Sequence, residues 1–426
     1  MTEDLDTSDD IASVEEGYLS PEEHHHHNAE QSRLLQLPTE LLNYVLSSLS
    51  DLDLVRISRT CRTLAQHASN DLLWADILNA NLPFKIHDPG LFASFRSLYA
   101  AYFPCWFIPR SKVWFADTEH TGNLILARYD NRRGVVEAYR VVVERRGHGF
   151  QHWEWNPEVM VQPFCPKVSL WLDDPVLFFK NTPSAEEPPQ TPRFLNGETR
   201  MPMALEYQSV FNSFSLCSKR LPRDRDILIN HQWPPPNIPS EQRVYRDADS
   251  HWSEWDEQQL HLSEISESAF RIRRWAQMGM SIFTAGSSET LTTFATLDPS
   301  LYTPTKEMPY QGIWVGDYSA HGSEFLLFLH RNRPDISAPQ QTDTDNDNSE
   351  SNLQGSLEAI KLTGDPNVPR GEISFVSHDI GPGGFVRVAN EVLFPGARVV
   401  RSQGHVAGLG FRDGESWHSR LFYTVY

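Results

Sequence analysis

The stretch LPTELLNYVLSSLSDLDLVRISRTCRTLAQHASNDLLWADIL, residues 37–78, decides the organisation of this chain. Apolar residues recur at helical spacing in its first part. Because the residue before a proline avoids the α region, we expect a helix with Leu37 just outside it and Pro38 in its first turn. A second helix is predicted from about Leu52 and a third around Leu73 to Leu78. Three such short helices cannot enclose a large core, so the pattern predicts that a partner covers one apolar face.

These residues resemble an F-box, the segment that docks substrate receptors onto the Skp adaptor of an SCF-type ubiquitin ligase. The resemblance rests on pieces in the expected order, namely Leu37-Pro38, Glu40-Leu41-Leu42, Asp53-Leu54, Thr60-Cys61-Arg62 and Leu73-Trp74. It implies the Skp adaptor and a cullin as partners. The adaptor-binding residues that it implies are Leu37, Pro38, Leu41, Leu42, Leu46, Leu49 and Trp74. An ordinary three-helix packing unit is the alternative, because leucine stripes are common in helices.

The net charge of −19 on 426 residues is concentrated in two polar segments. Sixteen of the excess negative charges lie in residues 1–30 and 335–358, neither of which contains Lys or Arg. The remaining body is nearly neutral and has no basic stripe, which argues against nucleic acid as the main partner.

The four cysteines are widely spaced and form no CxxC pair, a pattern that predicts reduced thiols rather than a disulfide framework or a zinc site. No apolar run approaches the roughly 18 residues that a membrane helix needs. The acidic N-terminus also lacks the layout of a signal peptide. We therefore expect no membrane partner and a location in the cytoplasm and/or nucleus.

Composition divides the chain into four parts. Residues 1–32 are acidic and poor in aliphatic side chains, which predicts a disordered tail. Within it, His24 to His27 form a tract for which a solvated, low-complexity interpretation is favoured over metal binding. The F-box follows over 33–80, and a connecting helix and linker occupy 81–109. The last part, 110–426, has polar insertions expected at 181–200, 232–262 and 335–356.

The chain from Lys112 onward changes to β-branched and aromatic runs separated by turn residues, which predicts an antiparallel sheet or barrel. The expected strands include residues 113–115, 124–129, 135–143, 153–155, 168–172, 374–376, 398–400 and 417–426, with two more within 309–329. Between Ser263 and Gly279 apolar residues recur at helical spacing around Arg271, Arg273 and Arg274, so one amphipathic helix is expected there. The predicted fold is α+β: a three-helix F-box followed by a mainly antiparallel β-barrel, with an inserted helix and long polar loops, closed by the C-terminal strand.

Three segments of the C-terminal part carry a second resemblance: GIWVGDYSAHGSEF, KLTGDPNVPRGEISF and GHVAGLGF, in this order. They look like the substrate-binding barrel of F-box only protein 31 and its fungal relatives, a cyclin D1-binding family. The resemblance implies capture of a client's C-terminal end, from cyclin-like or C-terminally amidated proteins, for ubiquitination. It implies Asp365, Asn367 and Lys361 as client-binding residues. Tyr318, His321 and Glu324 match a family pattern, with a less defined role.

The chemistry of Asp365 fits such a role without deciding it. A carboxylate on a Pro-flanked turn accepts two N–H bonds from a terminal amide and repels a free terminal carboxylate. Asp-Pro-Asn is equally a good turn sequence, so pocket and turn stay open as alternatives. Among the tryptophans, Trp314 is the best candidate for lining the mouth of a client pocket.

Other chemistry finds little support in the sequence. Asp317, His321 and Glu324 lack a third ligand at a defined spacing, so a structural hydrogen-bond network is favoured over a metal or acid-base site. No catalytic residue, metal site or cofactor is expected. Two alternative functions stay open: a barrel that binds a small ligand or acts as an enzyme and is localised by the F-box, and an F-box protein acting outside a ligase.

Overall fold

The fold was analysed in a computed structural model of the whole chain. The structure describes residues 32–116, 118, 121–144, 151–153, 156–161, 166–181, 194–195, 197–201, 203, 210–218, 261–276, 290–317, 323–331, 354–364, 370–389, 395–406 and 418–425. The chain divides into two compact units, Met1–Ser69 and Asn70–Tyr426. None of the described helices is long and apolar enough to cross a membrane.

The first unit consists of short helices, each begun by a polar or proline cap. A 3-10 turn, Arg33–Gln36, precedes α1 (Thr39–Ser47), and Pro38 is the residue immediately before α1. Leu37 lies outside the helix, as predicted, but Pro38 is the N-cap and not part of the first turn as expected. α2 (Asp51–Ser58) begins after Ser50, whose hydroxyl accepts a hydrogen bond from Asp53 N.

The predicted second helix is in fact two helices, so the stretch contains four helices and not three. α2 ends at Ser58 and α3 runs over Arg62–Ala68. The hydroxyls of Ser58 and Thr60 donate to backbone carbonyls of the preceding turn, at 2.7 Å each, and Cys61 caps α3. Such side-chain hydrogen bonds compete with the backbone hydrogen bonds of a helix and explain the break between α2 and α3.

The second unit opens with three helices, and the second of them lies in the segment 81–109 for which a connecting helix and linker were predicted. α4 (Asp71–Ala80) precedes α5 (Phe95–Tyr102) and α6 (Phe107–Ser111). The carboxylate of Asp71 accepts from Phe95 N at 2.7 Å. Tyr102 is fully buried and its hydroxyl donates to Gly134 O, and burial raises the pKa of Tyr102 to about 12.

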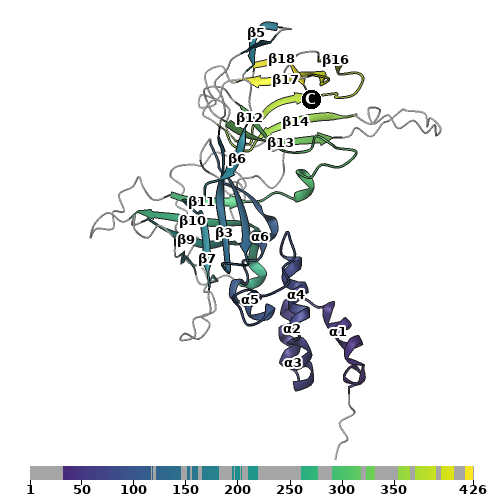
Figure 1. Cartoon of the computed structure of the whole chain (residues 1–426), viewed down its shortest axis with the longest axis vertical. Coiled ribbons are helices and arrows are strands. Elements are labelled where there is room, and N and C mark those ends of the chain that lie inside the picture. Colours follow the sequence, from purple (N-terminus) through teal and green to yellow (C-terminus); the bar gives the residue numbers. More distant parts are fainter. Residues whose placement is uncertain are drawn as a thin grey trace, which may run out of the picture. The chain divides into compact units, whose positions relative to one another are not determined.

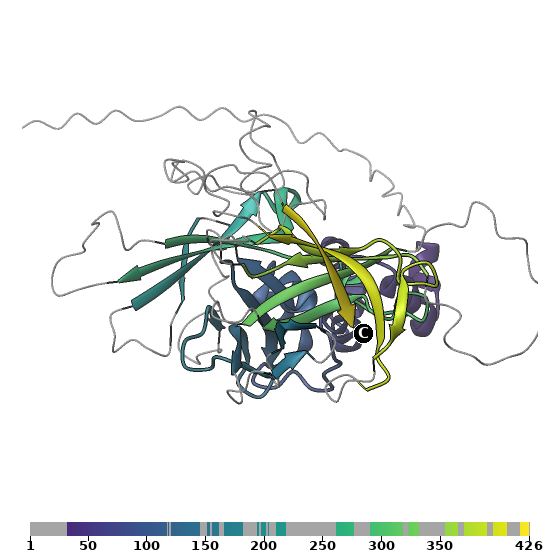
Figure 2. The same ribbon diagram turned by 90° about the horizontal axis from the view of Figure 1, so that it is seen from above.

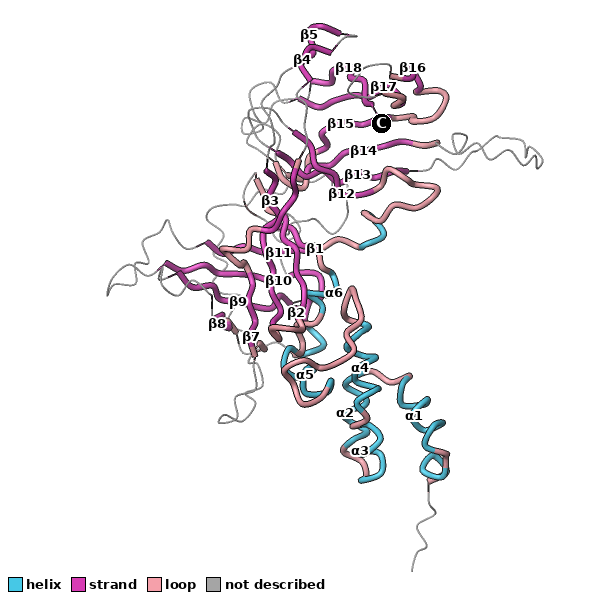
Figure 3. The backbone as a smooth tube through the Cα atoms, viewed as in Figure 1, coloured by secondary structure: helices cyan, strands magenta, loops and turns pink. Residues whose placement is uncertain are grey.

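A nine-stranded antiparallel sheet follows these helices (Figures 1 and 3). Its order is β6-β3-β2-β1-β11-β10-β9-β8, and β7 also pairs with β3. The strands are β1 (Val113–Ala116), β2 (Leu124–Asp130), β3 (Val135–Glu144), β6 (Lys167–Leu170), β7 (Leu177–Lys180), β8 (Thr199–Met201), β9 (Val210–Ser218), β10 (Ile265–Ala276) and β11 (Thr290–Ala295). A separate hairpin pairs β4 (Gln151–Trp153) with β5 (Asn156–Val161).

The predicted helix between Ser263 and Gly279 is wrong, because β10 is a strand paired with both β9 and β11. The register with β9 shifts between Ile265 and Phe270. This irregularity brings Ala269 and Phe270, which are consecutive, both into buried positions and imitates helical spacing. Beyond it, buried Phe270 and Ile272 alternate with arginines, the period of a strand.

A seven-stranded antiparallel sheet makes up the C-terminal part. Its order is β12-β13-β14-β15-β17-β16, with β18 on β17. The strands are β12 (Gly312–Asp317), β13 (Ser323–Arg331), β14 (Ser356–Lys361), β15 (Ile373–Ser377), β16 (Phe385–Val388), β17 (Arg398–Val406) and β18 (His418–Val425). In Figure 2 the yellow C-terminal strands curve strongly.

Both sheets are curled half-barrels, so the expectation of one closed barrel is corrected. Among the described residues β18 pairs with β17 alone, and no ladder joins it to β12. The nine-stranded sheet brings its ends close, since Phe178 N on β7 donates to the Met201 Sδ on β8 at 3.4 Å. A single sheet was expected because the sequence indicates which segments form strands but not which of these strands pair with one another.

The two sheets of the second unit share a core. Phe115 and Leu124 from the nine-stranded sheet cluster with residues of β13 and β14, and all are less than a tenth exposed. The buried members from the other sheet are Phe325, Leu327, Leu329, Ile360 and Leu362. The predicted insertion at 181–200 also contributes to packing, because Phe194 is buried against Phe179 and Phe214.

Candidate functional site

The three segments that carried the second resemblance meet at one end of the seven-stranded sheet. The β12–β13 connection follows Asp317, the β14–β15 connection follows Gly364, and the β17–β18 connection follows Val406. Because neighbouring strands are antiparallel, these three connections lie at the same end of the sheet, which we call the motif end. The acidic segment at 335–356 belongs to the β13–β14 connection, which starts and finishes at the opposite end.

Gly364 and Arg370, the described residues that flank 365–369, are both hydrogen-bonded to the chain that leads into β2. Gly364 N donates to Thr121 O at 2.8 Å, and Arg370 Nε donates to Thr118 O at 2.8 Å. Arg370 is 7% exposed, so its guanidinium is a buried tether rather than a surface charge. The chain that leads into β2 therefore positions Gly364 and Arg370, the described residues on either side of the segment that contains Asp365 and Asn367.

Gly122 lies beneath this tether, and its replacement tests the anchoring. Its φ is +63°, and an added Cβ would lie 2.9 Å from Arg370 Cδ and 3.0 Å from Leu362 O. We expect Gly122→Ala to lower the free energy of unfolding by about 1–3 kcal/mol, measured by urea titration. Gly396→Ala is the control, because its φ of +77° adds the same backbone strain while nothing lies within 4 Å. Equal losses for the two variants would contradict close packing under Arg370.

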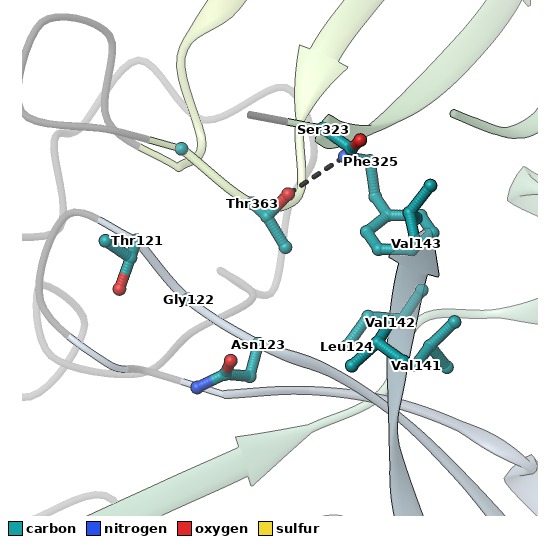
Figure 4. Close-up of a pocket in the computed structure, with 11 residues that line it drawn as sticks. Thr121, Gly122, Asn123, Leu124, Val141, Val142, Val143, Ser323, Phe325 and Thr363 are labelled. Atoms are coloured by element: carbon teal, nitrogen blue, oxygen red, sulfur yellow. Dashed lines mark hydrogen bonds between the residues drawn. The ribbon is translucent and has the colours of Figure 1, made fainter. Parts of the chain in front are cut away.

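A pocket of about 580 Å³ opens beside these anchors, a volume in the usual range of binding sites. Thr363 and Gly364, which lead directly into residues 365–369, line it. The other lining residues are Thr121, Gly122, Asn123, Leu124, Val141, Val142, Val143, Ser323 and Phe325. Figure 4 shows Thr121 to Asn123 facing the three valines across the pocket, and Thr363 Oγ1 accepts from Phe325 N at 2.9 Å. The lining combines small polar side chains with apolar ones and carries no charge.

Lys361 occupies a different place from the one predicted. It is fully buried, and its Nζ lies 2.8 Å from Glu324 Oε2 on the neighbouring strand. The predicted contact between the Lys361 ammonium and a client is therefore corrected to a buried ion pair with Glu324. The hydrogen-bond network predicted for Asp317, His321 and Glu324 stays a prediction, because His321 and the side chain of Asp317 lie outside the described residues.

Trp314 lies on the same face of the sheet as Lys361. The register places Trp314 opposite Leu326, and Leu326 opposite Lys361. Trp314 is 44% exposed, and its ring stacks on Phe328 at 5.4 Å between centroids. Its Nε1 donates to Tyr310 O at 2.9 Å, so the indole is fixed while one side of it stays accessible. This arrangement suits contact with an apolar client side chain.

Four predicted client residues lie outside the described residues: Tyr318, His321, Asp365 and Asn367. The described chain on either side places both segments at the motif end. Their contacts with a client stay predictions.

The predicted adaptor residues divide into buried and exposed sets. Leu42, Leu46 and Trp74 are at most 3% exposed, so they support the helices instead of offering a contact surface. Leu49 and Leu37 are partly buried, and Pro38 is exposed. Leu41 is 52% exposed.

Two further exposed residues, Tyr44 and Val45, join Leu41 on α1 and were not among the predicted adaptor residues. Tyr44 is 75% and Val45 42% exposed. The three residues follow the i, i+3, i+4 spacing of one helix face, and we call them the α1 face. That spacing was the signal that could have separated contact residues from core residues.

Comparison with known proteins agrees with both parts of the chain. A family model described as F-box-like matches residues 34–80, and one described as the Cyclin D1 binding domain matches residues 294–423. Over 119 residues the chain is 34% identical to the protein named "Protein EXECUTER 2, chloroplastic" from Arabidopsis thaliana. That match covers 26% of this chain and 17% of the relative, so the chain spans less than a fifth of the relative's length. The F-box-like domain supports a substrate-recognition role in SCF-type ligases, and the second domain supports a cyclin-like client. Together, the two family matches support an F-box protein of the cyclin D1-binding family.

Proposed function

We propose that this chain is the substrate receptor of an SCF-type ubiquitin ligase, which captures cyclin-like clients and directs them to degradation. One observation carries the proposal: a single chain contains an F-box-like match at 34–80 and a cyclin D1-binding match at 294–423. The receptor itself performs no bond chemistry. It raises the effective concentration of client lysines near the ubiquitin-conjugating enzyme that the cullin recruits.

The α1 face is the proposed contact with the Skp adaptor. Leu41, Tyr44 and Val45 expose apolar surface on one side of a short helix. A large exposed aromatic side chain flanked by aliphatic ones has the composition of an interface hot spot. We further propose a location in the cytoplasm and/or nucleus, a proposal that the free thiols of Cys61, Cys105 and Cys217 support.

The proposed client site is the motif end of the seven-stranded sheet. Trp314 offers an accessible ring on one face of this sheet, and the pocket, lined by Phe325, opens beside Thr363 and Gly364 on the other face. We propose that the pocket receives the client's C-terminal end and that Asp365 accepts N–H bonds when this end is an amide. A carboxylate at that position disfavours a free acid through like-charge repulsion.

A pair of peptides tests the role of Asp365. The last twelve residues of cyclin D1 are prepared as the C-terminal amide and as the free acid, each with a fluorescent label at the N-terminus. We expect the full chain to bind the amide about tenfold more tightly in fluorescence anisotropy, since charge-assisted bonds are stronger than neutral ones.

The matched variants are Asp365→Asn and, as control, Asp76→Asn at an exposed position of α4. Asp365→Asn should shrink the difference between the two peptides, while Asp76→Asn should leave it intact. Equal affinity of the wild-type chain for both peptides would remove the amide hypothesis and leave cyclin capture to be explained by other contacts.

A further inference from the structure

Among the residues that the structure describes, part of one strand edge of the nine-stranded sheet has no strand partner beside the pocket. β2 and β3 pair in register as far as Ile125 and Arg140. β3 continues to Glu144, and over these last residues its strand partner in the described part of the chain is β6, on the side away from β2. The chain before β2 turns toward β1, where Ala116 N donates to Asn123 O at 2.8 Å. β2 and β3 thus separate, and an edge without a neighbour can template another strand.

The backbone groups that face this gap follow from the hydrogen bonds on the other side of β3. Val176 N donates to Ala138 O at 2.8 Å, and Trp171 N donates to Arg140 O at 2.9 Å. These two carbonyls point to the side of β6 and β7. Since the backbone groups of consecutive strand residues point to opposite sides, Val141 and Val143 direct theirs toward the gap.

The gap coincides with the 580 Å³ pocket. Val141 to Val143 form one wall, and Thr121 to Asn123 form the other (Figure 4). Four residues of strand edge, from Val141 to Glu144, offer about 13 Å for pairing, enough for a short extended segment. The polar lining groups of Thr121, Asn123 and Thr363 suit a peptide backbone better than a charged ligand.

We propose that an extended segment of the cyclin-like client adds to β3 as a new strand at Val141–Val143. The proposal rests on the proposed function, because it assigns a binding mode to client capture. The client is the proposed occupant of this strand edge because the pocket is continuous with the proposed client site. Thr363 and Gly364 line the pocket, belong to the cyclin D1-binding match and lead into residues 365–369. The β3 wall lies outside that match, so the client site extends beyond residues 294–423. Strand addition supplies affinity through main-chain bonds, and the pockets around it supply selectivity.

Proline at position 143 tests strand addition directly. Val143→Pro removes a backbone N–H that faces the pocket and no donor to β6, and β-edge positions tolerate proline. We expect the affinity of the full chain for full-length cyclin D1, measured by biolayer interferometry, to fall about tenfold or more, because both the bond and the close approach of the client strand are lost.

The matched control is Val168→Pro on β6, the register partner of Val143. In such a pair the backbone groups point away from each other, so Val168 N faces the outer edge of β6 and the control should bind cyclin D1 like the wild type. If Val143→Pro folds and binds as tightly as the control, strand addition is overturned and the proposed function stands. If the wild-type chain does not bind cyclin D1, the proposed function itself fails.

A measurement on the unaltered chain covers the case in which Val143→Pro does not fold. The Val143 amide should exchange its hydrogen at least tenfold more slowly once cyclin D1 is bound, because the new strand's carbonyl accepts its bond. Unchanged exchange at Val143, with protection elsewhere, would place the client on another surface and overturn the proposal.

Discussion

Replacing Leu41 and Tyr44 together by aspartate is expected to lower the affinity for the Skp adaptor by a hundredfold or more while the fold is kept. Both side chains are at least half exposed on the α1 face, so the change places charge on a surface and not in the core. An adaptor that covers this face would have to desolvate two carboxylates without partners, and truncating hot-spot contacts costs about 2 kcal/mol or more each. Co-purification of the adaptor with the tagged chain and a titration by calorimetry measure the loss.

The matched control is Leu172→Asp, at a position 59% exposed in the second unit. It introduces one aspartate at an apolar surface residue that is not part of the α1 face and should leave adaptor binding unchanged. The neighbouring replacement Leu42→Asp is unsuitable as a test, because Leu42 is 1% exposed and a buried charge there would destabilise the helices. Retained adaptor binding in the Leu41/Tyr44 variant, with an intact fold, would contradict docking through this face.

Removal of the carboxylate of Glu324 should cause the largest loss of stability. Lys361 is fully buried, and its ammonium contacts Glu324 at 2.8 Å across β13 and β14. Glu324→Leu leaves the buried ammonium without this counter-charge, and breaking one side of such a pair costs about 3–5 kcal/mol. The midpoint of urea unfolding at neutral pH should fall accordingly.

A double variant separates this cause from simple repacking. Glu324→Leu combined with Lys361→Met removes both charges and should regain most of the lost stability, because apolar residues of similar volume can replace a buried pair. Glu358→Leu is the control on the same strands, since its partner Arg331 is about half exposed and exposed pairs contribute under about 1 kcal/mol. A double variant no more stable than Glu324→Leu would show that the ion pair is not the cause.

Much of the fold could be predicted from local patterns. The stripe of α1 was readable because burial repeats at the helix period, and β2, β3 and β13 were readable as β-branched and aromatic runs between turn residues. β10 was misread because a bulge between Ile265 and Phe270 disturbs that period. The number of sheets was beyond reach for a different reason, since it depends on which distant strands pair.

The site was predictable in position but not in detail. The motif segments pointed to one region, and the antiparallel topology brings their connections together. That Lys361 is buried against Glu324 depends on the β13–β14 register, which a long intervening connection leaves unspecified. The wall of Val141 to Val143 was equally out of reach, because it comes from a strand nearly two hundred residues earlier in the chain.

The central claim is that one chain bridges the Skp adaptor and a cyclin-like client. The most direct measurement mixes the purified full chain with a Skp-type adaptor and cyclin D1 and determines the mass of the complex by size-exclusion chromatography with light scattering. The account predicts a single species that contains all three proteins in equal amounts. Adaptor and cyclin D1 that never appear together with the chain in one species would contradict it.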